Sequence, residues 1–95
     1  MEELARLERW VRIMDRMHNM AEMVNGDYGG TICRVRSVRG RGNVVELGGV
    51  ELAEFGHFDE SGALEAYHML RGVREAFWCM CKRGCFGSVD VVNAA

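Results

Sequence analysis

Residues 31–55 read TICRVRSVRGRGNVVELGGVELAEF. Along residues 31–38, apolar side chains alternate with arginines, and a period of two is typical of a strand with one buried face. Residues 39–42, Arg-Gly-Arg-Gly, then turn the chain. Two further apolar stretches flank Gly48 and Gly49, and paired glycines favour a two-residue hairpin because both can adopt positive φ. This stretch predicts three antiparallel strands that are joined in sequence.

A helix is predicted on each side of these strands. Residues 4–24 carry apolar side chains three and four positions apart, and Asn25-Gly26 then offers the left-handed residue that ends helices. The second helix begins with Asp59 or Ser61 as its N-cap and ends before Gly84. Its predicted core stripe consists of Ala63, Ala66, Tyr67, Leu70, Val73, Phe77, Met80 and Cys81.

The last part of the chain completes the predicted order. Residues 86–92 are apolar and β-branched, which favours a short final strand. The order α-β-β-β-α-β predicts an α+β fold, with an antiparallel sheet and two helices packed on one face. A length of 95 residues with 48% hydrophobic and 27% charged side chains suits a single domain, residues 1–95, around one core.

Composition also limits which partners the protein could bind and in which cellular compartment it is expected. The net charge of −2 gives no overall attraction to nucleic acid or to an anionic membrane. The acidic start of the chain does not resemble a signal peptide, and no apolar run approaches the roughly 18 residues of a membrane span. We therefore predict a cytoplasmic protein whose four cysteines stay reduced.

The first helix carries two adjacent apolar stripes. One contains Leu4, Leu7, Val11, Met14 and Ala21, and the other contains Trp10, Ile13, Met17, Met20 and Val24, with Met23 at the edge. A helix on a sheet buries a stripe of about 100°, so the surplus predicts an exposed partner surface around Trp10, Met14 and Met17. The first stripe, extended through His18, also has heptad spacing, which would suit a homodimer. The alternative is that all of these side chains belong to the core.

Four arginines form the only concentrated positive charge: Arg34, Arg36, Arg39 and Arg41. Such a group could bind phosphates of a nucleic acid or an acidic protein surface. Aromatic platforms for single-stranded bases do not alternate with these arginines. The alternative is a solvated strand face whose arginines pair with Glu46, Glu51 or Glu54.

The helix–three strands–helix order resembles that of the double-stranded RNA-binding domain. The resemblance implies nucleic-acid binding in which lysines at the start of the second helix contact phosphates. This chain departs from that pattern, because its second helix opens with Asp59-Glu60 and has no lysine there.

Cys79, Cys81 and Cys85 are spaced C-x-C-x3-C. Cys79 and Cys81 lie about 200° apart around a helix, so only Cys81 and Cys85 could converge on a zinc ion, with Cys33 or His57 completing the ligands. The alternative is that Cys81 and Cys85 are small core side chains and Cys79 is a partly exposed thiol.

The sequence predicts neither a catalytic site nor a cofactor. It contains no nucleophile elbow, phosphate loop or paired zinc knuckle, and His57 stands alone in a loop. The first hypothesis is therefore a non-catalytic protein-binding module that acts as an inhibitor or adaptor, and nucleic-acid binding and a zinc-stabilised domain are the alternatives. In size and character the chain is similar to small phage-encoded inhibitors, including anti-CRISPR proteins.

Overall fold

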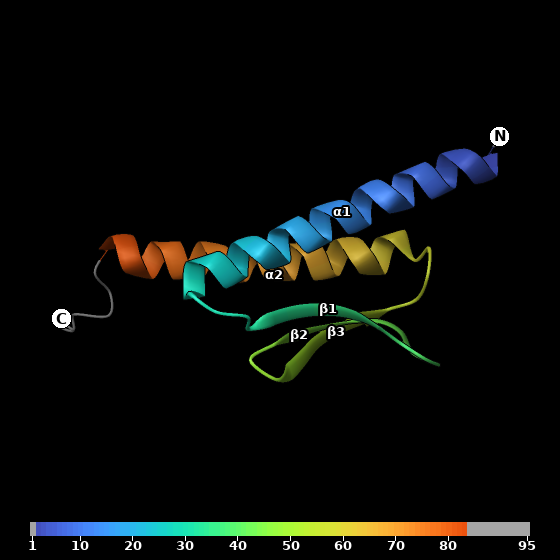
Figure 1. Cartoon of the computed structure of the whole chain (residues 1–95). Coiled ribbons are helices and arrows are strands. Elements are labelled where there is room, and N and C mark those ends of the chain that lie inside the picture. The colour runs from blue at the N-terminus through green and yellow to red at the C-terminus, as the bar shows by residue number, and fades with distance from the viewer. Residues whose placement is uncertain (1, 84–95) are drawn as a thin grey trace.

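The computed structural model describes residues 2–83 (Figure 1). Its elements are α1 (Glu2–Tyr28), β1 (Cys33–Val38), β2 (Gly42–Leu47), β3 (Val50–Phe55) and α2 (Glu60–Arg83). The α-β-β-β-α part of the predicted order is thus confirmed. The predicted final strand, residues 86–92, lies outside the described residues.

The three strands form one antiparallel sheet in the order β1-β2-β3. Val35 of β1 pairs with Val45 of β2, and Val45 pairs in turn with Ala53 of β3. Gly48 and Gly49 form the predicted two-residue hairpin with φ values of 60° and 84°, which match a turn that requires positive φ at both positions. The predicted three-stranded antiparallel sheet and its hairpin are therefore confirmed, and the structure adds an irregularity in the β2–β3 register between Val45 and Glu46.

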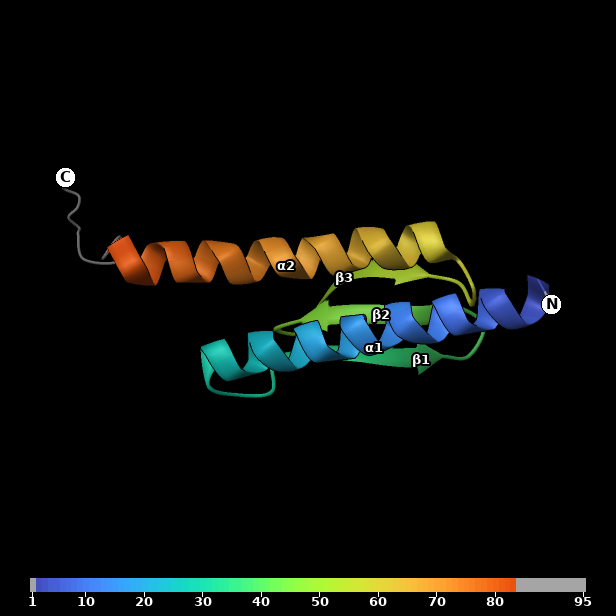
Figure 2. The same ribbon diagram turned by 90° about the horizontal axis from the view of Figure 1, so that it is seen from above.

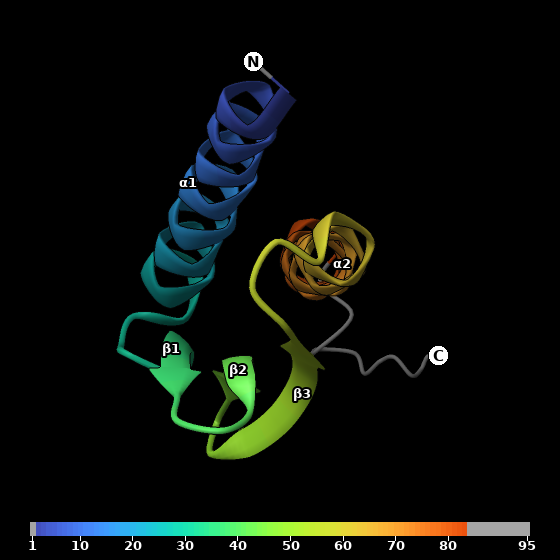
Figure 3. The same cartoon turned by 90° about the vertical axis from the view of Figure 1, so that its right-hand side faces the viewer.

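Both helices pack on the same face of the sheet, as predicted. Figure 3 shows α1 on the β1 side and α2 on the β3 side, and Figures 1 and 2 show that the two helices run in the same direction. Side-chain contacts join them at both ends. Arg9 Nε lies 3.3 Å from Glu60 Oε2, and Trp78 Nε1 donates a hydrogen bond of 3.1 Å to Asp27 Oδ2.

The core fills the space between the helices and the sheet. It contains Trp10, Met17, Met20, Ala21 and Val24 of α1, Cys33, Val45 and Phe55 of the sheet, and Ala63, Ala66 and Leu70 of α2. The α2 core stripe was predicted correctly in its first half. It was wrong at Met80 and Cys81, which are exposed, because the last turns of α2 extend past the end of the sheet (Figure 1).

The end of α1 differs from the prediction. The helix continues through Asn25 and Gly26, and the left-handed residue is Gly29, with φ 74°. The Gly30 N–H donates to the Asn25 carbonyl and the Gly29 N–H donates to the Gly26 carbonyl, which is a Schellman cap. The Asn25 side chain is used elsewhere: its Oδ1 accepts from the N–H groups of Ile32 and Cys33 at 2.9 and 2.7 Å. Asn25 therefore fastens the start of β1 to α1.

The start of α2 follows the prediction. Asp59 Oδ1 accepts a hydrogen bond of 3.0 Å from the Gly62 N–H, which makes Asp59 the N-cap. The preceding residue, Phe58, has a left-handed φ of 64°, and its ring lies 5.6 Å from that of Trp10. This contact ties the loop between β3 and α2 to the first helix.

Candidate protein-binding surface

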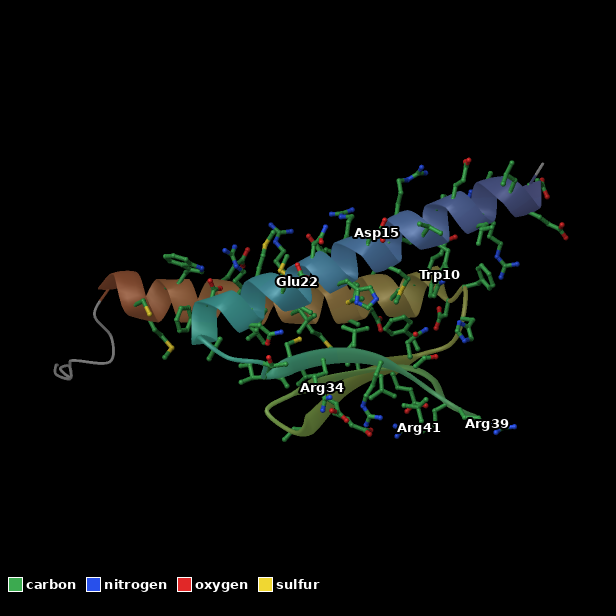
Figure 4. All side chains as sticks on the ribbon, viewed as in Figure 1. Trp10, Asp15, Glu22, Arg34, Arg39 and Arg41 are labelled. Carbon is green, nitrogen blue, oxygen red and sulfur yellow. The ribbon has the colours of Figure 1, made fainter. Side chains whose placement is uncertain are left out.

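The apolar surface predicted around Trp10 and Met17 is not exposed. Met17 is fully buried, Trp10 is only 8% exposed, and Met20 is also buried. Met14 is half-buried and packs against the core. The prediction of exposure was wrong because α1 lies over β1 and beside α2, so two neighbours cover a wider arc of the helix than a sheet alone would (Figure 3). In Figure 4, Trp10 lies below its helix, on the side of the sheet.

A different part of α1 is apolar and exposed. Leu4, Leu7 and Val11 are 56%, 45% and 48% exposed, and we call these three residues the outer row. They lie about 120° around the helix from the centre of the buried stripe. The first turns of α1 project past the end of the sheet (Figures 1 and 2), so neither β1 nor α2 reaches the outer row.

The sequence contained a signal that separates the two stripes. The buried stripe stays apolar over the part of the helix that packs on the sheet, from Trp10 to Val24. The outer row has the same helical position as His18 further along, which is exposed and polar. A stripe that becomes polar after three turns marks the solvent side, whereas the sequence prediction centred the exposed surface on Trp10, Met14 and Met17.

An acidic stripe runs beside the outer row. Glu8, Asp15 and Glu22 are seven residues apart, so they share one line along α1, about 40° from the outer row. All three are exposed, and none forms an ion pair or hydrogen bond with another residue in the part of the chain that the structure describes. Figure 4 shows Asp15 and Glu22 on α1, on the opposite side of the molecule from the arginines of the sheet.

Two of the four sheet arginines form ion pairs with glutamates of the neighbouring strands. Arg41 donates two hydrogen bonds to Glu51, at 2.9 and 2.7 Å, and one of 2.6 Å to Glu54. Arg36 donates to Glu46 across the β1–β2 pair. These hydrogen bonds hold the pKa values of Glu46 and Glu51 below their ordinary range. The predicted pairing of this face with Glu46, Glu51 and Glu54 is confirmed.

This pairing reduces the positive charge that the face offers to a ligand. Figure 4 places Arg34, Arg39 and Arg41 below the sheet, on the face away from the helices. The four arginines share this region with three glutamates, which leaves a net charge of +1. Among residues 2–81, Arg34 and Arg39 form no ion pair. Only these two are free to contact a phosphate or a carboxylate.

The cysteines do not come together. Cys33 is buried on β1, where burial raises the pKa of its thiol, whereas Cys79 and Cys81 are exposed on α2. The prediction that Cys81 is a core side chain was wrong, and Cys85 lies outside the described residues. Within residues 2–81, no three His, Cys, Asp or Glu side chains are grouped closely enough to hold a metal ion.

The described residues offer little that resembles an enclosed ligand site. A hollow of about 270 Å³ lies against the first turns of α1 and is lined by Glu2, Ala5, Arg6 and Arg9. His57 is exposed in the loop before α2. Neither described helix has the length and hydropathy needed to cross a membrane.

The fold and this surface define a small α+β domain with two parallel helices on one face of a three-stranded sheet and an exposed apolar row on the first helix. Comparison with protein-family models, with curated proteins and with solved structures gives no match for the chain.

Proposed function

We propose that this protein is a non-catalytic protein-binding module that acts as an inhibitor or adaptor by occupying a partner's surface with α1. The exposure of Leu4, Leu7 and Val11 on a projecting helix carries the proposal. Three large aliphatic side chains in one line, next to charged residues, are typical of a docking surface.

The outer row is large enough to matter for affinity. Full burial of a Leu or Val side chain contributes about 1.5–3 kcal/mol. These three side chains are about half exposed, so completing their burial contributes about 3 kcal/mol in total. That free energy corresponds to roughly 100-fold in Kd. A standard interface buries about 800 Å² per partner, so the outer row is the apolar centre of an interface with a polar rim around it.

Leu7→Asp tests this proposal. We expect the variant to keep a native circular dichroism spectrum. Loss of the buried half of Leu7 costs about 1 kcal/mol and Asp in a helix about 0.5 kcal/mol more, which is well below the stability of a small domain. We expect it to bind the natural partner at least roughly 100-fold more weakly, because binding would bury a carboxylate in an apolar contact. The partner is first isolated with the wild-type protein from its natural source, and Kd values are then measured by calorimetry.

The matched control is Leu64→Asp, which places the same change on an exposed leucine of α2. We expect its affinity to match that of the wild type. Unchanged affinity for Leu7→Asp, or an equal loss for both variants, would contradict the assignment of the outer row as the binding surface.

Nucleic-acid binding through Arg34 and Arg39 is the alternative function. If only these two arginines contact phosphates, a plot of log K against log salt concentration has a slope of roughly −2, whereas four contacts give about −3 to −4. We expect no salt-dependent gel shift with RNA or DNA, because Arg36 and Arg41 are paired with glutamates. A shift that weakens with salt and disappears in an Arg34→Glu, Arg39→Glu variant would establish the alternative.

A further inference from the structure

We infer that the partner segment bound by α1 is a basic amphipathic helix, with apolar side chains along one edge and lysine or arginine beside them. This inference rests on the proposed function and adds the chemistry of the partner. It is carried by the position of the acidic stripe (Glu8, Asp15 and Glu22) relative to the outer row.

The spacing of these residues fits a second helix. Leu4, Leu7 and Val11 occupy successive a and d positions of a heptad, and the half-buried Met14 occupies the next d position. The acidic stripe occupies the e position of three successive heptads, a length of about 21 Å along α1. A partner helix whose side chains repeat every 3.5 residues can follow both lines over the first two heptads, up to Met14, after which the next a position is the polar His18.

The acidic stripe lies beside the a and d positions of α1, on the side that faces solvent. The g positions on the opposite side are Trp10 and Met17, which are buried in this domain's own core. A docked helix therefore meets the carboxylates along one flank only, and cationic side chains on that flank would be close to them. Opposite charges at such positions select the partner and its orientation.

Three of the four arginines of α1 are directed away from the acidic stripe, and only Arg12, four residues after Glu8, lies beside it. Arg9 forms an ion pair with Glu60, and Arg16 lies over the Tyr67 ring at 4.9 Å, so both are directed toward α2. Arg12 is exposed and forms no ion pair within the described part of the chain. The carboxylates thus remain available to a cationic partner.

The same charges disfavour a second copy of this chain as the occupant. In an antiparallel pair of α1 helices, e positions face e positions, so Glu8, Asp15 and Glu22 would lie opposite their own equivalents. In a parallel pair, e positions face g positions, which the domain's own core already occupies. A homodimer through this helix is therefore the less favourable arrangement.

Three synthetic peptides test the inference with the wild-type protein. The first has leucine at a and d and lysine at e and g over three heptads, the second has glutamate in place of lysine, and the third has serine in place of leucine. We expect saturable binding of the first peptide at low salt by fluorescence anisotropy, and at least 10-fold weaker binding of the other two. Equal binding of the lysine and glutamate peptides would overturn the inference.

Charge-reversed variants locate the contact. Asp15→Lys and Glu65→Lys change the net charge by the same amount, and both residues are exposed, on α1 and α2 respectively. We expect Asp15→Lys to weaken binding of the lysine peptide about fivefold at low salt, as for the reversal of one exposed ion pair. We expect Glu65→Lys to bind as the wild type does. Equal losses in the two variants would mean that only the overall charge acts, which contradicts a specific acidic flank.

The outcomes separate the inference from the proposed function. If Leu7→Asp loses the natural partner while the lysine peptide shows no preference, the inference fails and the proposed function stands. If Leu7→Asp keeps the natural partner, the proposed function itself fails. A wild-type dimer in analytical ultracentrifugation that Leu7→Asp dissociates would show a second copy as the occupant and overturn the inference.

Discussion

Met17→Asp is expected to leave the protein without a stable fold. Met17 has no exposed surface and lies in the core between α1, the sheet and α2. The variant loses the packing of a buried methionine, about 2–5 kcal/mol, and places an unpaired carboxylate in an apolar site at a further cost of several kcal/mol. Small domains have a total stability of about 5–15 kcal/mol, so little or none would remain.

Urea denaturation followed by circular dichroism measures this effect. We expect a cooperative transition for the wild type and for Leu7→Asp, and none for Met17→Asp. The comparison separates two apolar stripes of one helix, because Leu7 and Met17 carry the same change. A Met17→Asp protein with a transition midpoint close to that of the wild type would contradict the assignment of this stripe to the core.

Gly42→Ala is expected to destabilise the domain by about 3 kcal/mol. Gly42 begins β2 with a φ of 97°, and a Cβ atom there would lie 2.7 Å from the Phe55 carbonyl oxygen and 3.0 Å from the Gly56 Cα. The backbone conformation costs about 1–3 kcal/mol for a residue with a side chain, and the clash with rigid backbone adds a similar amount unless the strands shift. The change therefore acts on the pairing of β2 with β3.

Gly40→Ala is the matched control in the same turn. Gly40 has a similar φ of 82°, but a Cβ atom there would meet no other atom within 4 Å. We expect a loss of only about 1 kcal/mol, from backbone strain alone. Denaturant midpoints of the two variants give the difference, and equal losses would show that the close approach at Gly42 has no energetic effect.

The strands and the start of α2 could be predicted from the sequence, because turn and cap residues near each element determine where it begins and ends. The Gly48-Gly49 hairpin and the Asp59 cap follow from residue types whose conformational preferences hold in most contexts. The end of α1 depends on a tertiary contact: Asn25 forms hydrogen bonds with Ile32 and Cys33 of the following segment, so it stays helical and leaves the cap to Gly29. The sequence around Asn25 alone does not predict these hydrogen bonds.

The sequence analysis predicted an exposed apolar surface on α1, but it placed that surface on the wrong side of the helix. The excess of apolar residues on α1 was visible, but periodicity does not show which of two adjacent stripes faces the sheet. The packing of α2 beside α1 decides it, burying Trp10 and Met17 and leaving Leu4, Leu7 and Val11 in solvent. The pairing of the sheet arginines with Glu46, Glu51 or Glu54 was predicted only as an alternative. Register alone does not give the partners, because Arg36 lies opposite Val44 and pairs diagonally with Glu46, and Arg41 precedes β2.

The most direct test of the outer row is site-specific photo-crosslinking in cells of the natural source. A photoreactive phenylalanine analogue replaces Leu7 or Val11 of the outer row, or Arg34 of the opposite face. We expect Leu7 and Val11 to yield a covalent adduct with one and the same protein, and Arg34 to yield none with it. An adduct formed from Arg34 and absent from both α1 positions would contradict the claim that this protein binds its partner through the outer row.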